Sequence, residues 1–187
     1  MEQAEELGAV AIGMDIDHSF NGQGQPDNVL GNAMRPKTLA EIASYCKRTK
    51  LPFLIKGVLS AQDAQKCLDA GAGGVLVSHH HGIMASAVPA LMVLPEIVET
   101  VKGKIPVFVD GSFENGMDVF KALALGADGV GVGRALMPPI QQQGPEGCQH
   151  ILEDITGELA AAMARTGSRD VRHIDTSLLW IDGKHLH

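Results

Sequence analysis

The sequence is poor in aromatic residues and in cysteine, and both shortages narrow what the protein can be. Aromatic residues make up 4% of the 187 residues, too few for a surface on which nucleic-acid bases stack. The three cysteines, Cys46, Cys67 and Cys148, are widely spaced, which indicates neither a disulfide framework nor a zinc ribbon. We therefore expect a reducing, cytoplasmic environment.

Positive charge and long apolar runs are also scarce. The chain has 15 Lys and Arg against 22 Asp and Glu, a net charge of -7, which repels phosphate backbones at long range. The first residues lack the basic and apolar segments of a secretion signal, and no apolar run approaches the roughly 20 residues that span a bilayer. We expect a small-molecule substrate, and no nucleic-acid or membrane partner.

Aliphatic residues and glycine are abundant, and their arrangement indicates an α/β fold. Near-continuous Val, Ile and Leu predict five buried parallel strands, at residues 9–15, 52–58, 74–78, 106–111 and 128–134. Helical spacing predicts intervening helices at residues 37–50, 60–71, 89–103 and 117–127, and further helical segments at 133–143 and 146–165. The long loop at residues 21–34 is either a lid or a plain crossover.

Alternating strands and helices form either an open doubly wound sheet or a (β/α)8 barrel. A barrel usually takes about 250 residues, and this chain offers only five strands. The first and last of them have no neighbour on one edge and no Lys or Pro inside them to guard that edge. We therefore expect a homo-oligomer, or a chain complemented by a missing N-terminal segment.

Glycines end the last two strands, in the segments DGSFENG (residues 110–116) and GVGVGR (residues 129–134). Glycine lets backbone N–H groups approach an anion, and a following helix directs its positive dipole end toward it. In barrels, the loops after the last two strands commonly hold phosphate. The pattern predicts a phosphate site there, assisted by Arg134, although glycines also serve ordinary tight turns.

Polar residues gather at the predicted carboxyl ends of the strands, where barrel active sites lie. This group consists of Asp15, Lys56, Ser78, His80, Asp110 and Arg134. Lys56 ends an otherwise aliphatic strand, a costly position unless it meets an anion or an electron-rich ring. We expect it to face a ligand. Asp17 and His18 are interpreted as solvated loop residues.

The run His79, His80 and His81 raises the possibility of a metal site, because imidazole is a common zinc ligand. Consecutive residues of an extended chain point to opposite sides, so three adjacent histidines do not easily share one ion. We predict no metal. One histidine acting as a general base, oriented by a carboxylate such as Asp15, is the favoured interpretation.

Residues 51–82, the segment VPALMVLPEI and residues 106–136 together resemble the C-terminal part of the FMN-dependent α-hydroxy-acid oxidases and dehydrogenases, the family of glycolate oxidase and lactate oxidase. The resemblance extends from about residue 9 to 180 and covers only the later half of a family member. It implies that residues 1–187 are a single FMN-binding domain. That domain consists of the C-terminal five βα units of a (β/α)8 TIM barrel and lacks the N-terminal part.

The resemblance also implies roles for single residues. Lys56 matches the lysine beside flavin N1, His80 matches the active-site base, and Asp15 matches the carboxylate that partners this base. The implied cofactor-binding residues are Lys56, Ser78, Asp110, Gly111, Ser112, Gly133 and Arg134.

Departures from the family pattern concern its arginines. The arginine that holds the substrate carboxylate is Ile83 here, a phosphate-contacting arginine is Glu114, and a strand threonine near the flavin is Gly13. A second carboxylate-binding arginine has no counterpart in the stretch DIDHSFNGQG. Without the two guanidiniums a 2-hydroxy acid loses its charge-assisted anchors.

The sequence therefore predicts an FMN-dependent oxidoreductase acting on a CH–OH group of an undetermined small substrate, with hydride transfer to FMN. One alternative is an FMN barrel with other chemistry, such as isopentenyl diphosphate isomerase, which the scarcity of arginine disfavours. The other is a truncated, non-catalytic flavin-binding or assembly module.

Overall fold

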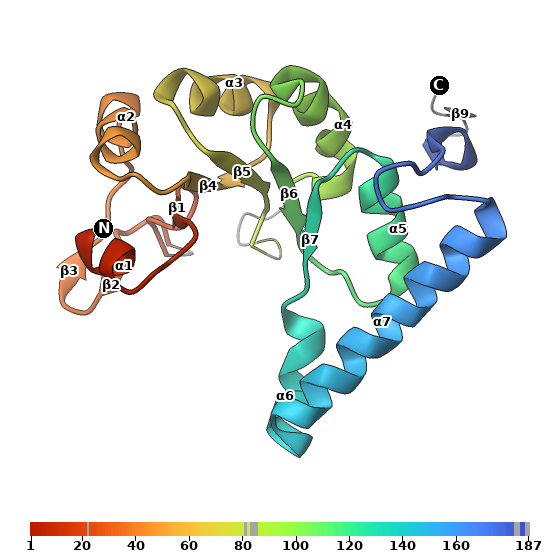
Figure 1. The fold of residues 1–187 in the computed structure, drawn as a ribbon. Coiled ribbons are helices and arrows are strands. Elements are labelled where there is room, and N and C mark those ends of the chain that lie inside the picture. The colour runs from red at the N-terminus through yellow and green to blue at the C-terminus, as the bar shows by residue number, and fades with distance from the viewer. Residues whose placement is uncertain (22, 81, 83–85, 182–183, 186–187) are drawn as a thin grey trace. The chain divides into compact units, whose positions relative to one another are not determined.

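The structure, a computed structural model, describes all residues except 22, 81, 83–85, 182–183 and 186–187. The chain divides into two compact units, Met1–Phe108 and Val109–His187, and each is described by itself (Figure 1). The boundary falls inside strand β6 (Val107–Asp110). The prediction of a single domain over residues 1–187 stays a prediction.

The first unit is a parallel sheet with its connecting helices. Its elements are α1 (Glu2–Glu6), β1 (Ile12–Asp15), β2 (Asn28–Val29), β3 (Asn32–Ala33), α2 (Leu39–Arg48), β4 (Phe53–Val58), α3 (Ala61–Ala70), β5 (Gly74–Val77) and α4 (Ala90–Val101). The strand order is β1-β4-β5 and then the beginning of β6, where the Val75 N–H donates to the Pro106 carbonyl at 3.0 Å. Strands β1, β4 and β5 are parallel, as the aliphatic pattern predicts.

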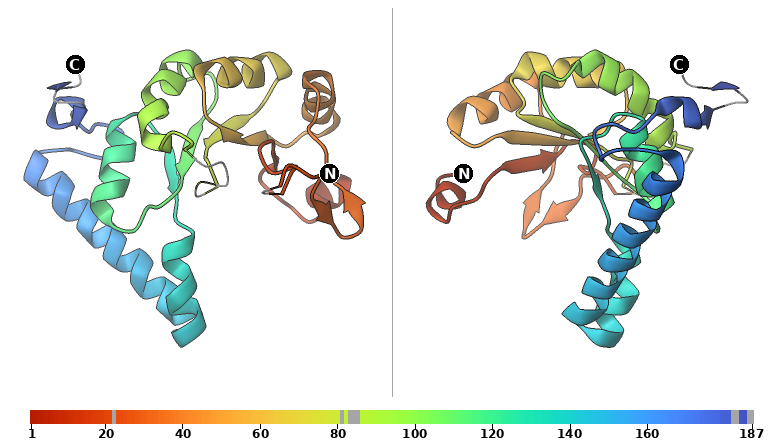
Figure 2. Two further views of the ribbon diagram at one scale, coloured as in Figure 1. Left: turned by 180° about the vertical axis from the view of Figure 1, so that it is seen from behind. Right: turned by 45° about the vertical axis from the view of Figure 1, so that its right-hand side comes forward.

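Helices α2, α3 and α4 follow one another along one side of strands β4 and β5 (Figures 1 and 2). Thr38 and Glu41 form a capping box at the start of α2, and Ser60 caps α3, so each helix begins where a side chain satisfies its first N–H groups. The core beneath them is aliphatic, and Ile55, Val75 and Leu94 are fully buried. Burial also raises the pKa of the Cys67 thiol, on α3, to about 12.

The loop at residues 21–34 is not entirely irregular. It contains the short antiparallel hairpin of β2 and β3, which turns at Leu30 and Gly31, both with positive φ. The Leu30 side chain is exposed at this turn. The choice between a lid and a plain crossover stays open as a prediction.

The second unit is mainly helical. It contains the end of β6, α5 (Gly116–Ala124), β7 (Gly129–Gly131), η1 (Arg134–Leu136), α6 (Met137–Gln143), α7 (Pro145–Thr166), η2 (Thr176–Leu178), β8 (Trp180–Ile181) and β9 (Lys184–His185). Helix α5 packs closely on α7, because a Cβ at Gly116 would lie 2.3 Å from the Leu159 backbone nitrogen. Strand β7 is the neighbour of β6.

The five predicted strands alternate with helices α2, α3, α4 and α5 as expected, and the β2–β3 hairpin between β1 and α2 is an addition to the predicted order. All five predicted strands are present, each one to several residues shorter than its aliphatic run. Among the described residues, no helix combines the length and the apolar character that crossing a membrane requires.

Candidate functional site in the first unit and the glycine loops of the second

Polar side chains meet at the carboxyl ends of β1, β4 and β5. Asp15 is the last residue of β1 and pairs in register with Lys56 of β4. The pairing continues one residue further, since the Ile16 N–H donates to the Lys56 carbonyl at 2.9 Å. Directly after this last bond to β4 the chain bends, at Ile16 and Asp17.

Lys56 contacts two of the predicted site residues. Its Nζ lies 3.0 Å from Asp15 Oδ1 and 2.5 Å from His80 Nε2. The lysine side chain is only 24% exposed, and an ammonium in such a position needs partners. Lys56 finds these partners in a carboxylate and an imidazole of the chain itself, and the prediction that it faces a ligand stays a prediction.

His80 lies in the loop after β5, in a conformation that few side chains adopt. Its φ is 46°, a left-handed value that costs roughly 1–3 kcal/mol and is found mainly at functional sites. The loop is held by Ser78, which is fully buried and whose Oγ accepts a hydrogen bond from the His80 N–H at 3.3 Å. Ser78 thus supports His80, and its role in cofactor binding stays a prediction.

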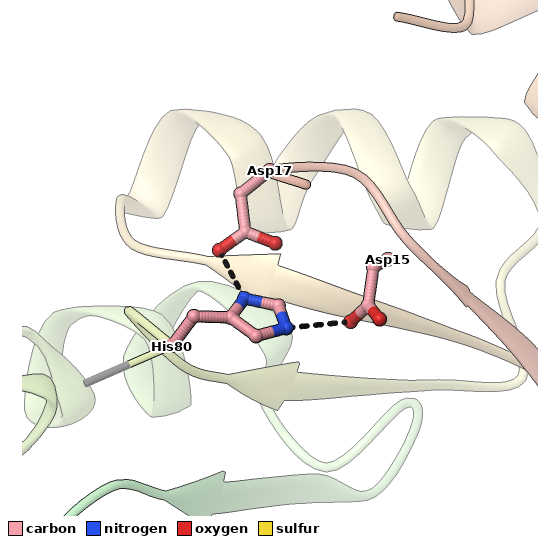
Figure 3. Close-up of side chains that lie close together, drawn as sticks. All are labelled: Asp15, Asp17 and His80. Carbon is pink, nitrogen blue, oxygen red and sulfur yellow. Dashed lines mark hydrogen bonds and ion pairs between the residues drawn. The ribbon is translucent and has the colours of Figure 1, made fainter. Parts of the chain in front are cut away.

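Both ring nitrogens of His80 face a carboxylate (Figure 3). Nδ1 lies 2.7 Å from Asp17 Oδ2, and Nε2 lies 3.4 Å from Asp15 Oδ1. The side chains of Asp17 and His80 are 20% and 21% exposed. We call Asp15, Asp17, Lys56 and His80 the His80 cluster.

The interpretation of Asp17 as a solvated loop residue is wrong. Its carboxylate is mostly buried against His80, and its Oδ1 is a buried atom without a hydrogen-bond partner in the described part of the chain. The physical reason is the bend of the chain at Ile16 and Asp17, directly after β1, which leaves the Asp17 carboxylate beside His80. The one signal in the sequence is that Asp17 lies close behind a strand carboxyl end, where barrel active sites are found. His18 is 42% exposed, and its ring lies 5.4 Å from that of His80.

Gly57 makes room for Asp17. The β4–β5 register shifts between Lys56 and Val58, and Gly57, between them, has a φ of 95°. A Cβ at this position would lie 2.3 Å from Asp17 Oδ1 and 2.5 Å from its Cγ. Only glycine satisfies both the backbone angle and the approach of the carboxylate.

The donors of the His80 cluster also have the geometry of a possible cation site. One ligand atom from each of Asp15, Asp17 and His80 lies within 4.8 Å of the other two. Two of these donors, however, already face the Lys56 ammonium, which repels a metal ion. The prediction that the protein uses no metal stays a prediction. The argument against three adjacent histidines sharing one ion also concerns His81, which lies outside the described residues.

The remaining predicted site residues lie in two loops of the second unit. We call residues 110–112 and 133–134 the glycine loops. Gly111 and Ser112 follow β6 with φ values of 109° and 59°. Gly133 and Arg134 are exposed, and a Cβ at Gly133 would meet no atom within 4 Å. Amide, hydroxyl and guanidinium donors of this kind suit a phosphate.

The expected contribution of the α5 dipole to phosphate binding stays a prediction, but two N–H groups of the first turn of that helix already have partners in the chain. Glu158 accepts a hydrogen bond from the Gly116 N–H at 2.7 Å, and Asn115 accepts one from the Asp118 N–H at 2.9 Å. The protein's own side chains therefore occupy the anion-binding end of α5. Gly111 and Ser112, in the loop before α5, stay the predicted phosphate contacts here.

The structure describes the surroundings of two positions at which the chain departs from the family pattern. At Gly13 a Cβ would lie 2.7 Å from the Leu54 carbonyl oxygen, so no threonine fits without a shift of the strands. Glu114 is exposed, and its N–H donates to Asp118 at 3.3 Å. Ile83, where the family has a carboxylate-binding arginine, lies outside the described residues.

The fold and the residues at its strand ends define a class, the barrel proteins with a site at the strand carboxyl ends, and the comparisons define the family. The family model described as FMN-dependent dehydrogenase matches residues 19–181. The chain belongs to this family, and its fold is part of a (β/α)8 barrel.

Individual relatives agree with this assignment. The chain is 38% identical to glycolate oxidase of Spinacia oleracea, over 87% of this chain and 44% of the relative. It is 46% identical to 2-hydroxyacid oxidase 1 of Mus musculus, over 80% of this chain and 41% of the relative. A solved mandelate oxidase variant with a monooxide FMN adduct superposes with a TM-score of 0.83 at 37% identity, covering 93% of this chain and 56% of that one. The chain thus spans about half the length of its relatives.

Proposed function

We propose that the chain supplies the FMN-binding part and the base of an oxidoreductase that oxidises a CH–OH group of a small organic substrate. The observation that carries the proposal is the His80 cluster at the carboxyl ends of β1, β4 and β5. A proton acceptor beside a partly buried cation is the arrangement that such an oxidation requires. Membership of the FMN-dependent family supports the choice of cofactor.

The residues of the chain suit FMN in chemical kind. Lys56 offers a positive charge for the flavin ring, and Ser112, Gly133 and Arg134 offer hydroxyl, amide and guanidinium donors for the phosphate. FMN, when bound, accepts the electrons that leave the substrate carbon. His80 accepts the proton of the substrate hydroxyl, and Asp15 and Lys56 adjust the charge around its Nε2.

The substrate is expected to lack the usual carboxylate anchor. Ile83 replaces the arginine that holds this group in the family, and no arginine lies between Lys56 and Arg134 in the sequence. Losing a buried charge-assisted pair costs about 2–5 kcal/mol of binding. We therefore propose that lactate and glycolate are poor substrates, although relatives of the chain are named glycolate oxidase and 2-hydroxyacid oxidase.

The experiment is anaerobic reduction of the flavin in the purified protein by a panel of small alcohols and hydroxy acids. At least one CH–OH compound should bleach the flavin, and His80→Gln should slow this by about 100-fold or more, as expected for loss of a general base. His150→Gln changes an exposed histidine of α7 and serves as the control. Flavin that no compound of the panel reduces would favour the non-catalytic flavin-binding alternative, and rapid bleaching by lactate would contradict the substrate proposal.

Assembly follows from the edge of β1. Among the described residues, β4 is the only strand that neighbours β1, and an unpaired strand edge promotes association. We propose that the chain is a homo-oligomer or pairs with a complementary segment, and that it works in the cytoplasm. Sedimentation of the purified 19.7 kDa chain as a stable monomer at micromolar concentration would contradict the oligomer.

A further inference from the structure

We infer that Asp17, and not Asp15, is the positioning residue of His80, and that it fixes the proton of the imidazole on Nδ1. The inference rests on the proposed role of His80 as a base and goes beyond it. It gives Asp15 a different task, as the partner of Lys56.

The distances separate the two carboxylates. Asp17 Oδ2 lies 2.7 Å from Nδ1, a good hydrogen-bond distance for a ring N–H donor. Asp15 Oδ1 lies 3.4 Å from Nε2 but 3.0 Å from Lys56 Nζ. The shorter contact of Asp15 is thus to the lysine, and the shorter carboxylate contact of His80 is to Asp17.

The contact of Lys56 with Nε2 agrees with this assignment. An ammonium group can only donate, so Nε2 accepts from Lys56 Nζ and carries no proton of its own in the neutral ring. The single proton of a neutral imidazole then lies on Nδ1, where Asp17 accepts it. Nε2 thus carries the basic lone pair, which in this structure accepts from Lys56 Nζ.

The backbone is arranged for this contact. Gly57 supplies the left-handed φ and the missing Cβ that let the Asp17 carboxylate approach, and Ser78 holds the strained His80 from the other side. A surface aspartate that met His80 by chance would not need either feature.

The summed charge of the His80 cluster explains how Asp15 and Asp17 can both lie beside His80. With His80 neutral, the four side chains of the His80 cluster sum to -1, and with His80 protonated they sum to zero. The unpartnered, buried Asp17 Oδ1 is costly beside a neutral ring and less so beside an imidazolium. Asp17 therefore also stabilises the charge that His80 gains when it takes a proton.

The test is NMR of the purified chain labelled with ¹⁵N in the histidine rings, which needs neither substrate nor flavin. At a pH where His80 is neutral, the two ring nitrogens should report a proton on Nδ1. Asp17→Ala should shift the population toward the Nε2–H form, which Asp15 can accept. Asp17→Asn keeps a carbonyl acceptor and should restore the Nδ1–H form. Asp15→Ala, the matched control, should leave the proton on Nδ1.

Gly57→Ala provides a second variant that moves the Asp17 carboxylate without removing it, and it should shift the same signals in the direction of Asp17→Ala. Unchanged His80 signals in Asp17→Ala, or a shift in Asp15→Ala instead, would overturn the inference and leave the proposed function standing. If the NMR signals are as expected but no compound reduces the flavin, the proposed function is contradicted and the inference about Asp17 stands. In an active protein, Asp17→Ala should lower kcat by about 100-fold or more with little change in KM.

Discussion

Gly57 and Gly133 show how differently the His80 cluster and the glycine loops are built. At Gly57 a side chain would collide with Asp17 and the backbone has a left-handed φ, whereas at Gly133 a Cβ would meet nothing within 4 Å. The protein's own contacts thus explain the first glycine but not the second. The exposed backbone of Gly133 leaves room for a ligand such as a phosphate to approach it closely.

The same contrast holds for the side chains. In the His80 cluster, carboxylates, an ammonium and an imidazole contact one another, so the cluster is organised before any ligand arrives. In the glycine loops, Gly133 and Arg134 are exposed. We expect substitutions in the glycine loops to alter FMN affinity and those in the cluster to alter the chemistry, with an additional loss of FMN affinity at Lys56, which is expected to face the flavin ring.

The largest effect is expected from Lys56→Met, which removes the only cation of the His80 cluster. The flavin midpoint potential should fall by about 60 mV, equivalent to about 100-fold for a two-electron couple, because the negative charge of the reduced ring loses its partner. Redox titration against reference dyes measures this. Lys66→Met changes a surface lysine paired with Asp63 and should leave the potential unchanged; an equal potential in both variants would place Lys56 away from the ring.

In the glycine loops, Arg134→Ala should weaken FMN binding and leave the flavin midpoint potential nearly unchanged. Loss of a charge-assisted hydrogen bond of about 1.5–3 kcal/mol raises the Kd by roughly 10- to 100-fold. Fluorescence titration gives the Kd, and Arg165→Ala, at an exposed position on α7, is the control. A Kd that Arg134→Ala leaves unchanged would remove this residue from the cofactor site.

The strands and their order could be predicted from the sequence because buried parallel strands leave a direct aliphatic pattern. Lys56 and His80 stood out for the same reason, as polar residues at the ends of such strands. Asp17 was missed because it follows its strand, and its local sequence does not predict the bend that leaves its carboxylate beside His80. Glu158 accepts a hydrogen bond from the Gly116 N–H, 42 residues away in the sequence. No local sequence pattern predicts such a tertiary contact.

A matched pair of alanine substitutions sharpens the contrast between the two glycines. Gly57→Ala should reduce the free energy of unfolding by about 1–3 kcal/mol, because the left-handed backbone and the Asp17 carboxylate oppose a Cβ. Gly133→Ala should reduce it by less than Gly57→Ala does, because its Cβ would meet no atom within 4 Å and only its backbone angles, φ -118° and ψ -84°, oppose a side chain. Urea denaturation without flavin measures both, and equal losses in the two variants would contradict the difference.

The smallest effect concerns a buried group of the first unit that lies outside the His80 cluster. The pKa of the Cys67 thiol is raised by burial from 9.0 to about 12, so between these values the folded state holds a proton that the unfolded state has lost. Stability should therefore be unaffected below about pH 9 and fall as the pH rises above it. Cys67→Ala should show a weaker alkaline decline, and Cys148→Ala the same decline as the parent. If the alkaline loss of stability is equally large in Cys67→Ala, other titrating groups cause it.

The most direct test of the account is a fluorescence titration of FMN with the purified chain, alongside Lys56→Met and Arg134→Ala. FMN binding is the claim on which both the His80 cluster and the glycine loops depend. The account predicts saturable binding of one FMN per chain, weakened by each substitution and unaffected by Lys66→Met. Binding that both substitutions leave intact, or no binding at saturating FMN, would contradict it.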